Sequence, residues 1–292
     1  MAGREGKRRR PVARQESSFR TILVLTLIPL FALLAYLLYR FAADQIARTK
    51  PSPAARAEGE APPERTPPRK APPKRGVLVV ILDDVGFDNQ PLERAMAIDP
   101  NISFSVLPNA RNARAFAQRL HRRGFEILCH LPMEPMDGGE SPGPNAITTA
   151  MADAEIVRLT RANLAAVPHA RGVNNHMGSR ATADGRVMRS VLSSLPEGMY
   201  FIDSMTTGNS IGYRVARELK VPTAVRTVFL DRVQEEEAIR SQIRRLAHAA
   251  GDDGAAVAIG HMYPVTIDVL EREIPRLRRA GYRVVRAGSV VE

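Results

Sequence analysis

Short apolar runs rich in β-branched residues alternate with amphipathic stretches from residue 76 to the end of the chain. Runs of this length and composition are typical of strands buried in a sheet. The pattern predicts strands at residues 77–82, 102–107, 125–129, 172–175, 199–202, 224–230, 255–259 and 282–285. We therefore expect one folded domain over residues 76–292.

Between several of these runs, apolar residues recur at a spacing near 3.6, which indicates helices that bury one face. The clearest of these helices lie at residues 110–123, 236–250 and 267–280. Gly124 and Gly281 each follow such a stretch and precede a strand, as residues just past a helix end do. The alternation predicts parallel strands joined by crossover helices. The number of units favours a barrel, and an open doubly wound sheet stays the alternative.

The chain before residue 76 follows a different pattern. Residues 21–39 carry no charge, and an apolar stretch of this length is enough for a helix to cross a bilayer. We predict a transmembrane helix at residues 21–41 and a basic cytoplasmic tail at residues 1–20, because Lys and Arg stay on the cytoplasmic side. This makes the chain a single-pass protein of the inner (cytoplasmic) membrane with a periplasmic C-terminal domain. A signal peptide cleaved near Ala42 and Ala43 is the alternative.

Residues 42–75 are rich in Pro, Ala, Arg, Lys and Glu, with eight prolines from Pro51 to Pro73. A segment of this composition has too few apolar residues to bury a core. Proline-rich segments adopt extended, semi-rigid conformations. The composition therefore predicts a disordered linker between the membrane helix and the folded domain.

The positive charge of the chain lies almost entirely outside the predicted domain. The formal net charge is +11. Residues 1–75 contain 16 Lys and Arg against 6 Asp and Glu, whereas residues 76–292 contain 26 against 25. A nucleic-acid-binding domain carries its positive charge on the folded surface. We therefore expect no nucleic acid among the partners of this protein.

Acidic and histidine side chains follow six of the predicted strands directly. Because the carboxyl ends of parallel strands share one edge, where ligands bind, these side chains are expected to gather in one place. Buried acids and imidazoles need a partner, and a divalent cation is such a partner. Imidazole together with carboxylate suits Zn, and also Fe, Co, Ni or Mn. The residues are Asp83, Asp84, His130, His176, Asp203, Asp231 and His261.

Five strings of the domain resemble those of one known family. LDDVG, GFEILCHLPMEP, GVNNHMGS, FIDSMT and AIGHMYP occur in the order found in the divergent polysaccharide deacetylases, the YibQ-like proteins. The resemblance covers nearly all of residues 76–292. This family is similar in turn to the wider polysaccharide deacetylases. That similarity implies a distorted (β/α) barrel and the metal-dependent removal of N- or O-acetyl groups from chitin-like chains, peptidoglycan or xylan.

The resemblance also implies roles for individual residues. A paired Asp ends the first strand in the wider family, which makes Asp83 the general base and Asp84 a metal ligand. His130 matches the first of two metal-binding His that stand four residues apart, and Glu134 takes the place of the second. His261 matches the His of the last motif, the usual general acid. Asp203 falls where a further acid orients the base or the general acid.

Glu134 and the string from Asn174 to Ser179 depart from the wider family, which has a second His and an Arg at these places. A carboxylate at this spacing is a competent ligand. Glu134 and His176 are therefore both candidates to complete a metal set with Asp84 and His130.

We expect a membrane-anchored deacetylase that holds a divalent metal, with Zn as the first choice, and acts on an acetylated envelope polysaccharide or oligosaccharide. In this hypothesis the metal lowers the pKa of a bound water, Asp83 takes the proton of that water, and His261 protonates the leaving group. The alternative is a non-catalytic polysaccharide-binding or scaffold protein that retains the fold, which the two departures favour. Another metal hydrolase, such as a phosphoesterase, is the third possibility.

Overall fold

The structure is a computed structural model that describes residues 34–42, 75–139, 141–251 and 254–292. The chain divides into two compact units, residues 1–69 and residues 70–292. In the first unit an exposed helix covers residues 34–42. No helix within the described ranges is long and apolar enough to span a membrane. The tail at residues 1–20, most of the segment at 21–41 and nearly all of the linker at 42–75 lie outside the described residues.

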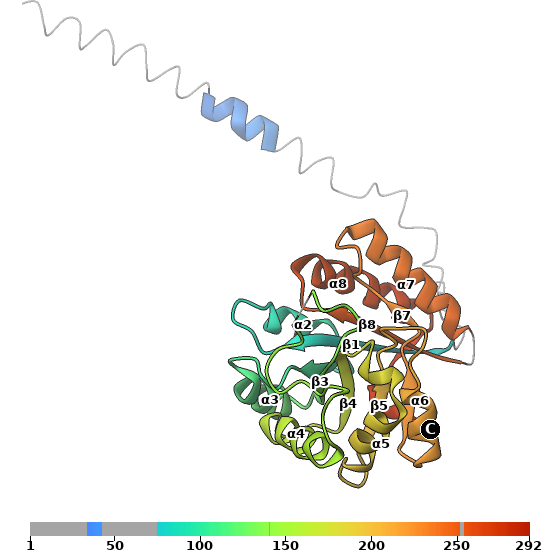
Figure 1. The fold of residues 1–292 in the computed structure, drawn as a ribbon. Coiled ribbons are helices and arrows are strands. Elements are labelled where there is room, and N and C mark those ends of the chain that lie inside the picture. Colours follow the sequence, from blue (N-terminus) through green and yellow to red (C-terminus); the bar gives the residue numbers. More distant parts are fainter. Residues whose placement is uncertain (1–33, 43–74, 140, 252–253) are drawn as a thin grey trace, which may run out of the picture. The chain divides into compact units, whose positions relative to one another are not determined.

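One sheet of nine parallel strands organises the second unit (Figure 1). The strands are β1 (Val77–Val85), β2 (Ser103–Val106), β3 (Glu126–Met133), β4 (Gly172–Met177), β5 (Tyr200–Asp203), β6 (Thr223–Val225), β7 (Val228–Phe229), β8 (Ala255–His261) and β9 (Arg283–Val284). The α-helices are α2 (Leu92–Ile98), α3 (Ala113–Arg122), α4 (Asp153–Ala166), α5 (Gly185–Ser193), α6 (Gly212–Glu218), α7 (Glu236–Ala250) and α8 (Pro264–Arg279). Short 3-10 turns lie at η2 (Ala181–Ala183) and η3 (Ala287–Ser289).

The sheet curls until its two edges meet at a seam. The strand order is β6-β5-β4-β3-β2-β1-β8-β7, and β9 pairs with the start of β1. The edge strands β6 and β7 are joined by Arg226 and Thr227 alone. The N–H of Arg226 donates to Asp203 O at 3.0 Å, and the N–H of Thr227 donates to Val257 O at 2.8 Å. This connection therefore reaches β5 on one side and β8 on the other, and the fold is a curled half-barrel of parallel strands.

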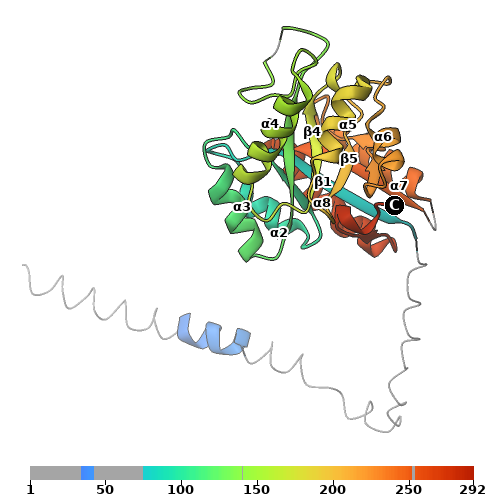
Figure 2. The ribbon, with the colours of Figure 1, turned by 60° about the horizontal axis from the view of Figure 1, so that its bottom comes forward.

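The two faces of the sheet carry different apolar clusters, because successive side chains of a strand point to opposite faces. On β1, Leu78, Val80 and Leu82 face outward and pack with apolar residues of the surrounding helices. Figures 1 and 2 show these helices around the outside of the sheet. Val79 and Ile81 face inward and join the inner cluster, whose other buried members are Leu128, Tyr200, Ile202, Val257, Ile259 and Ala287. Inward-facing residues that follow this cluster along the strands lie at the carboxyl ends of the strands, which form the mouth of the half-barrel.

The predicted elements match the structure, with differences at their ends. The helix predicted at 236–250 is α7, and those predicted at 110–123 and 267–280 are α3 and α8 with shifted ends. β1, β3, β4 and β8 each continue beyond their predicted carboxyl ends and include the polar residues expected to follow them. The run predicted at 224–230 is two strands, because Arg226 and Thr227 cross the seam.

Candidate metal centre

The candidate site residues continue the inward alternation of the strands beyond the inner cluster. Asp83 follows the inner-cluster residue Ile81 by two positions, and His130 and His261 follow inner-cluster residues of β3 and β8 in the same way. The register places Asp83 beside His261 across β1 and β8, and it places His130 beside Asn174 across β3 and β4. The parallel strands β1, β3, β4 and β8 thus bring acids and imidazoles to one end of the half-barrel.

A β-bulge allows two consecutive acids of β1 to face the same site. In a regular strand Asp84 would point away from Asp83. The register of β1 with β2 shifts by one residue between Leu82 and Val85, and such an extra residue re-aims the side chain that it carries. Asp84 has a φ of 56°, in the left-handed region that Asp enters more readily than most residues. His130 Nε2 consequently lies 3.5 Å from Asp83 Oδ2 and 3.3 Å from Asp84 Oδ1.

Three ligand atoms converge on one point at the mouth. Asp84 Oδ1 lies 3.3 Å from His130 Nε2 and 3.0 Å from His176 Nδ1, and the two nitrogens are 3.1 Å apart. Among the described atoms, Asp84 Oδ1 is buried yet has no hydrogen-bond partner. A tetrahedral ion with bonds of about 2.0–2.2 Å separates its ligand atoms by about 3.3–3.6 Å, a few tenths of an ångström wider than the separations here. The two imidazoles and the carboxylate therefore fit a divalent ion such as Zn, Fe, Co, Ni or Mn.

The electrostatics of this cluster suit a cation. Burial by itself raises the pKa of Asp84, but His130 and His176 outweigh it and hold this pKa well below its usual range. Burial by itself lowers the pKa of His130, and the carboxylates of Asp83 and Asp84 reverse the shift, so that the pKa is raised. Carboxylates that favour a proton on an imidazole also favour a metal ion in place of that proton.

Asp83 is held beside the ligands without belonging to them. Its side chain is buried, and Asn174 Nδ2 lies 2.9 Å from Oδ1 and 3.1 Å from Oδ2. Burial raises the pKa of Asp83, and the lowering effects of His130 and His261 do not cancel this shift. A raised pKa makes a carboxylate a better proton acceptor at neutral pH.

His261 of β8 lies next to the cluster and is oriented by an acid. Its Nε2 lies 3.7 Å from Asp84 Oδ2, and its Nδ1 lies 2.9 Å from Asp231 Oδ1. Asp231 Oδ2 also accepts the backbone N–H of His261 at 2.6 Å and the hydroxyl of Thr266 at 2.8 Å. Burial by itself lowers the pKa of His261, and the interaction with Asp231 overcomes it and raises the pKa to about 9.

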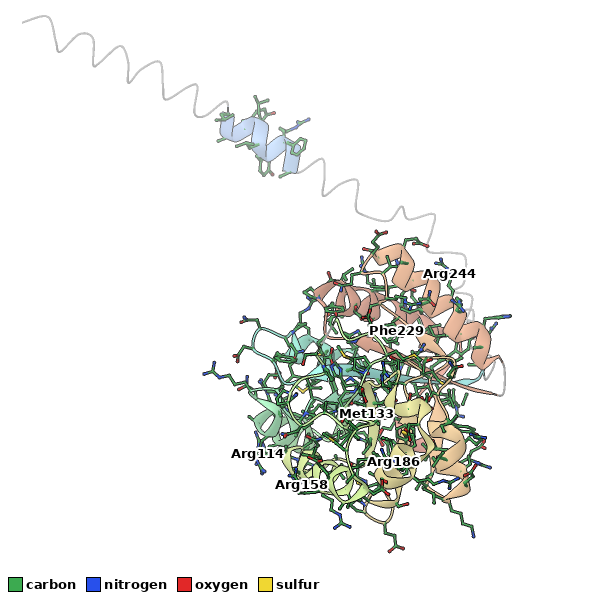
Figure 3. The ribbon with its side chains drawn as sticks, in the orientation of Figure 1. Arg114, Met133, Arg158, Arg186, Phe229 and Arg244 are labelled. Atoms are coloured by element: carbon green, nitrogen blue, oxygen red, sulfur yellow. The ribbon has the colours of Figure 1, made fainter. Side chains whose placement is uncertain are left out.

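Aromatic rings flank His261 on the inner face. The Phe229 ring lies 5.4 Å from the imidazole centre in an edge-on arrangement, and the Tyr263 ring lies 5.2 Å from it. Figure 3 places Phe229 toward the middle of the domain, whereas Arg114, Arg158 and Arg244 lie on the outer helices. Phe229 and Tyr263 thus line the site beside His261, whereas the labelled Arg side chains lie on the outer helices.

Glu134, one of the two candidates for the third ligand, points elsewhere. Its Oε2 accepts the N–H and the hydroxyl of Thr149 at 2.6 and 2.8 Å, and its Oε1 lies 3.4 Å from Arg180 Nε. These contacts tie down the chain that follows β3. The structure instead groups His176 with Asp84 and His130.

Asp203 does not take the orienting role that the resemblance implied. Phe201 belongs to the outer cluster, and alternation places Asp203 on that same outer face. Its carboxylate accepts hydrogen bonds near the start of α6, from Met205 N–H, Ser210 Oγ and Tyr213 N–H at 2.9, 2.7 and 3.0 Å. Asp231, which the strand-end pattern includes without a role, is the acid that contacts His261.

A second hollow lies at the opposite end of the half-barrel. A cavity of about 790 Å³ opens at the amino ends of β3 and β5, where its lining includes His121, Glu126, His169 and Arg171. The His121 and His169 rings stack with centroids 3.7 Å apart. In the described part of the chain, these residues do not form a group of converging metal ligands. We therefore place the candidate chemistry at the carboxyl ends of the strands.

The curled parallel sheet and the acid–imidazole cluster at its mouth define a deacetylase-type domain. The family model of the divergent polysaccharide deacetylases matches residues 80–291. The chain is 37% identical over 203 residues to the uncharacterized protein YibQ of Escherichia coli (strain K12), a match covering 69% of this chain and 63% of that protein. It is 35% identical over 207 residues to an uncharacterized protein of Haemophilus influenzae, covering 68% and 71%. The chain belongs to the divergent polysaccharide deacetylase family, as its motifs predict.

A solved structure supports the fold. An uncharacterized protein of Agrobacterium tumefaciens C58 superposes with a TM-score of 0.71 at 19% identity, over 75% of this chain and 90% of that one. The chain spans less than two thirds of the length of YibQ.

Proposed function

We propose that this protein is a metal-dependent carbohydrate deacetylase whose centre is formed by Asp84, His130 and His176. The observation that carries the proposal is the convergence of three ligand atoms within 3.3 Å of one another. Asp83 and His261 lie next to this cluster. Membership of the divergent polysaccharide deacetylases supports an acetylated polysaccharide or oligosaccharide as the substrate.

The residues divide the proton transfers between them. A divalent cation held by the three ligands would act as a Lewis acid toward water and toward the acetyl carbonyl. Asp83, buried with a raised pKa, accepts the proton of the attacking water. His261 has a pKa of about 9 and therefore carries a proton at neutral pH. It delivers this proton to the amine or alcohol that leaves, and Asp231 keeps the imidazole in position.

We further propose zinc as the metal and an extracytoplasmic location. Two imidazoles with one carboxylate form a ligand set found in zinc hydrolases. The uncharged stretch at residues 21–39 and the basic residues before it support a single inner-membrane anchor and a periplasmic domain.

The test combines metal analysis with acetate release. The purified full-length chain is dialysed against Zn²⁺, its metal content is measured, and it is incubated with N-acetylated and O-acetylated glycans. We expect one bound metal per chain and acetate release that is lost in Asp83→Asn, which keeps the ligands. A chain that binds glycan but neither binds metal nor releases acetate would support the scaffold alternative instead.

A further inference from the structure

We propose that Asn174 is a positioning residue that serves two parts of the centre through a single amide. It holds Asp83 in place, and it fixes the tautomer of His130 that can bind a metal. This inference rests on the proposed function, because it assigns Asp83 and His130 to the same reaction. It gives a role in the site to a residue to which the family resemblance assigned none.

Asn174 lies at the middle of the cluster. It is a residue of β4, it is fully buried, and it pairs directly with His130 of β3. Its side chain faces inward because it stands two residues before His176 on the same strand. Its Oδ1 lies 2.9 Å from His130 Nδ1 and 2.5 Å from the hydroxyl of Ser105, while its Nδ2 faces both oxygens of Asp83.

The carboxylate of Asp83 determines which way the amide points. An ionised carboxylate accepts hydrogen bonds and donates none. If the amide were flipped, Asn174 Oδ1 would face the two carboxylate oxygens of Asp83, which are also acceptors. The N–H groups of Asn174 would then point away from Asp83. The orientation with Nδ2 on Asp83 is therefore the one that satisfies both groups.

This orientation in turn fixes the proton of His130. Asn174 Oδ1 is an acceptor with two lone pairs, and its two neighbours, the Ser105 hydroxyl and His130 Nδ1, must both donate to it. The proton of neutral His130 consequently sits on Nδ1. The lone pair of Nε2 is then directed toward Asp84 and His176, as a metal ligand requires.

The adjacent residue shows what an ordinary buried asparagine does here. Asn175 faces the other side of β4 and bonds mainly to the backbone: its Nδ2 donates to Met177 O at 2.7 Å, and its Oδ1 accepts the N–H of Ser204 at 2.9 Å. Among the described residues, the side-chain hydrogen bonds of Asn174 go instead to Ser105, Asp83 and His130. Asn175 is therefore a matched control of the same type, strand and burial.

The experiment compares Asn174→Leu, Asn174→Asp and Asn175→Leu in the full-length chain. The Zn²⁺ dissociation constant is measured by competition with a chelator, and acetate release and urea unfolding are measured on the same samples. Asn174→Leu removes the acceptor for His130, and we expect Zn²⁺ affinity to fall about 10–100-fold, as for other groups that orient metal ligands. Asn175→Leu lowers stability and leaves the Zn²⁺ affinity of the folded chain unchanged.

Asn174→Asp separates the two tasks. The new carboxylate still accepts from His130 and Ser105, so Zn²⁺ affinity stays within about threefold of the parent or tightens. It has no N–H to give to Asp83 and places a second carboxylate beside it, so acetate release falls at least tenfold, of the order of a lost general base.

Three outcomes contradict the inference or a part of it, and they are distinguishable. A parent chain that binds no Zn²⁺ contradicts the proposed function together with this inference. A parent chain that binds Zn²⁺ and releases acetate, with Asn174→Leu matching Asn175→Leu in Zn²⁺ affinity, contradicts this inference alone. Equal losses of affinity and turnover in Asn174→Asp and Asn174→Leu contradict the division of tasks.

Discussion

Replacing Asp231 by Asn tests the role of His261 as the proton donor. The substitution keeps the shape of the side chain and removes the charge that raises the pKa of His261 to about 9. Without that charge the pKa falls toward its ordinary value near 6.5, because burial opposes protonation and only the weaker effects of Asp84 and Asp83 still support it. A shift of about 2.5 pKa units corresponds to about 3 kcal/mol of differential interaction with the protonated ring.

The expected effect depends on pH with a definite sign. At pH 8 a group with a pKa of about 9 is about 90% protonated, whereas one with a pKa of 6.5 is about 3% protonated. Acetate release by Asp231→Asn at pH 8 is therefore reduced about 30-fold or more through this effect. At pH 6 both groups are mostly protonated, and the loss shrinks to less than about twofold. The alkaline limb of the pH profile moves down by about 2.5 units.

The assay is acetate release from an N-acetylated glycan between pH 5.5 and 9.5 at saturating metal, with unfolding by urea measured in parallel. Asp203→Asn is the matched control, since Asp203 is also buried at the end of a strand but bonds to the start of α6. We expect it to lower stability without moving the alkaline limb. A loss in Asp231→Asn that is the same at every pH would refute the assignment of His261 as the proton donor.

Three further predictions concern ligands and stability. His176→Ala abolishes stoichiometric metal binding by the purified chain, whereas Glu134→Ala retains it because Glu134 bonds to Thr149; the reverse pattern in metal analysis would exchange their roles. In the metal-free chain, the raised pKa of His261 adds stability that is complete below about pH 6.5 and is lost as pH rises through about 9. Urea unfolding at pH 6, 8 and 10 should show this decline. A difference in the free energy of unfolding between the parent chain and Asp231→Asn that does not change with pH would contradict it. Gly172→Ala places a Cβ 2.3 Å from the Tyr200 ring and should lower the free energy of unfolding by about 1–3 kcal/mol while leaving metal affinity intact, so an unchanged urea midpoint would contradict the packing.

The sequence predicts the parallel α/β class and most of the site, because both follow from the alternation of the strands. Asp83, His130 and His261 each extend a period-two apolar pattern by one inward position. The predicted strand limits are less accurate, because a polar residue at a strand end is typical of a loop in the sequence. Only the pairing with adjacent strands shows that it belongs to the strand. The bulge at Asp84 leaves no signal in one sequence, because a strict alternation would turn that side chain away.

The choice between Asp203 and Asp231 depends on the order of strands in space. Both acids end a strand, and nothing local separates them. β7 pairs with β8, which carries His261, whereas β5 lies between β4 and β6 and directs Asp203 to the outer face. Asn174 could have been found from its spacing of two from His176, but its partners come from β1, β2 and β3 and required the register.

The most direct measurement is anomalous X-ray diffraction from crystals of the full-length chain grown with Zn²⁺. The account predicts one strong peak at the mouth of the half-barrel, about 2.0–2.2 Å from Asp84 Oδ1, His130 Nε2 and His176 Nδ1. Crystals that show no peak there at saturating Zn²⁺, or a peak bound by Glu134 in place of His176, would contradict it.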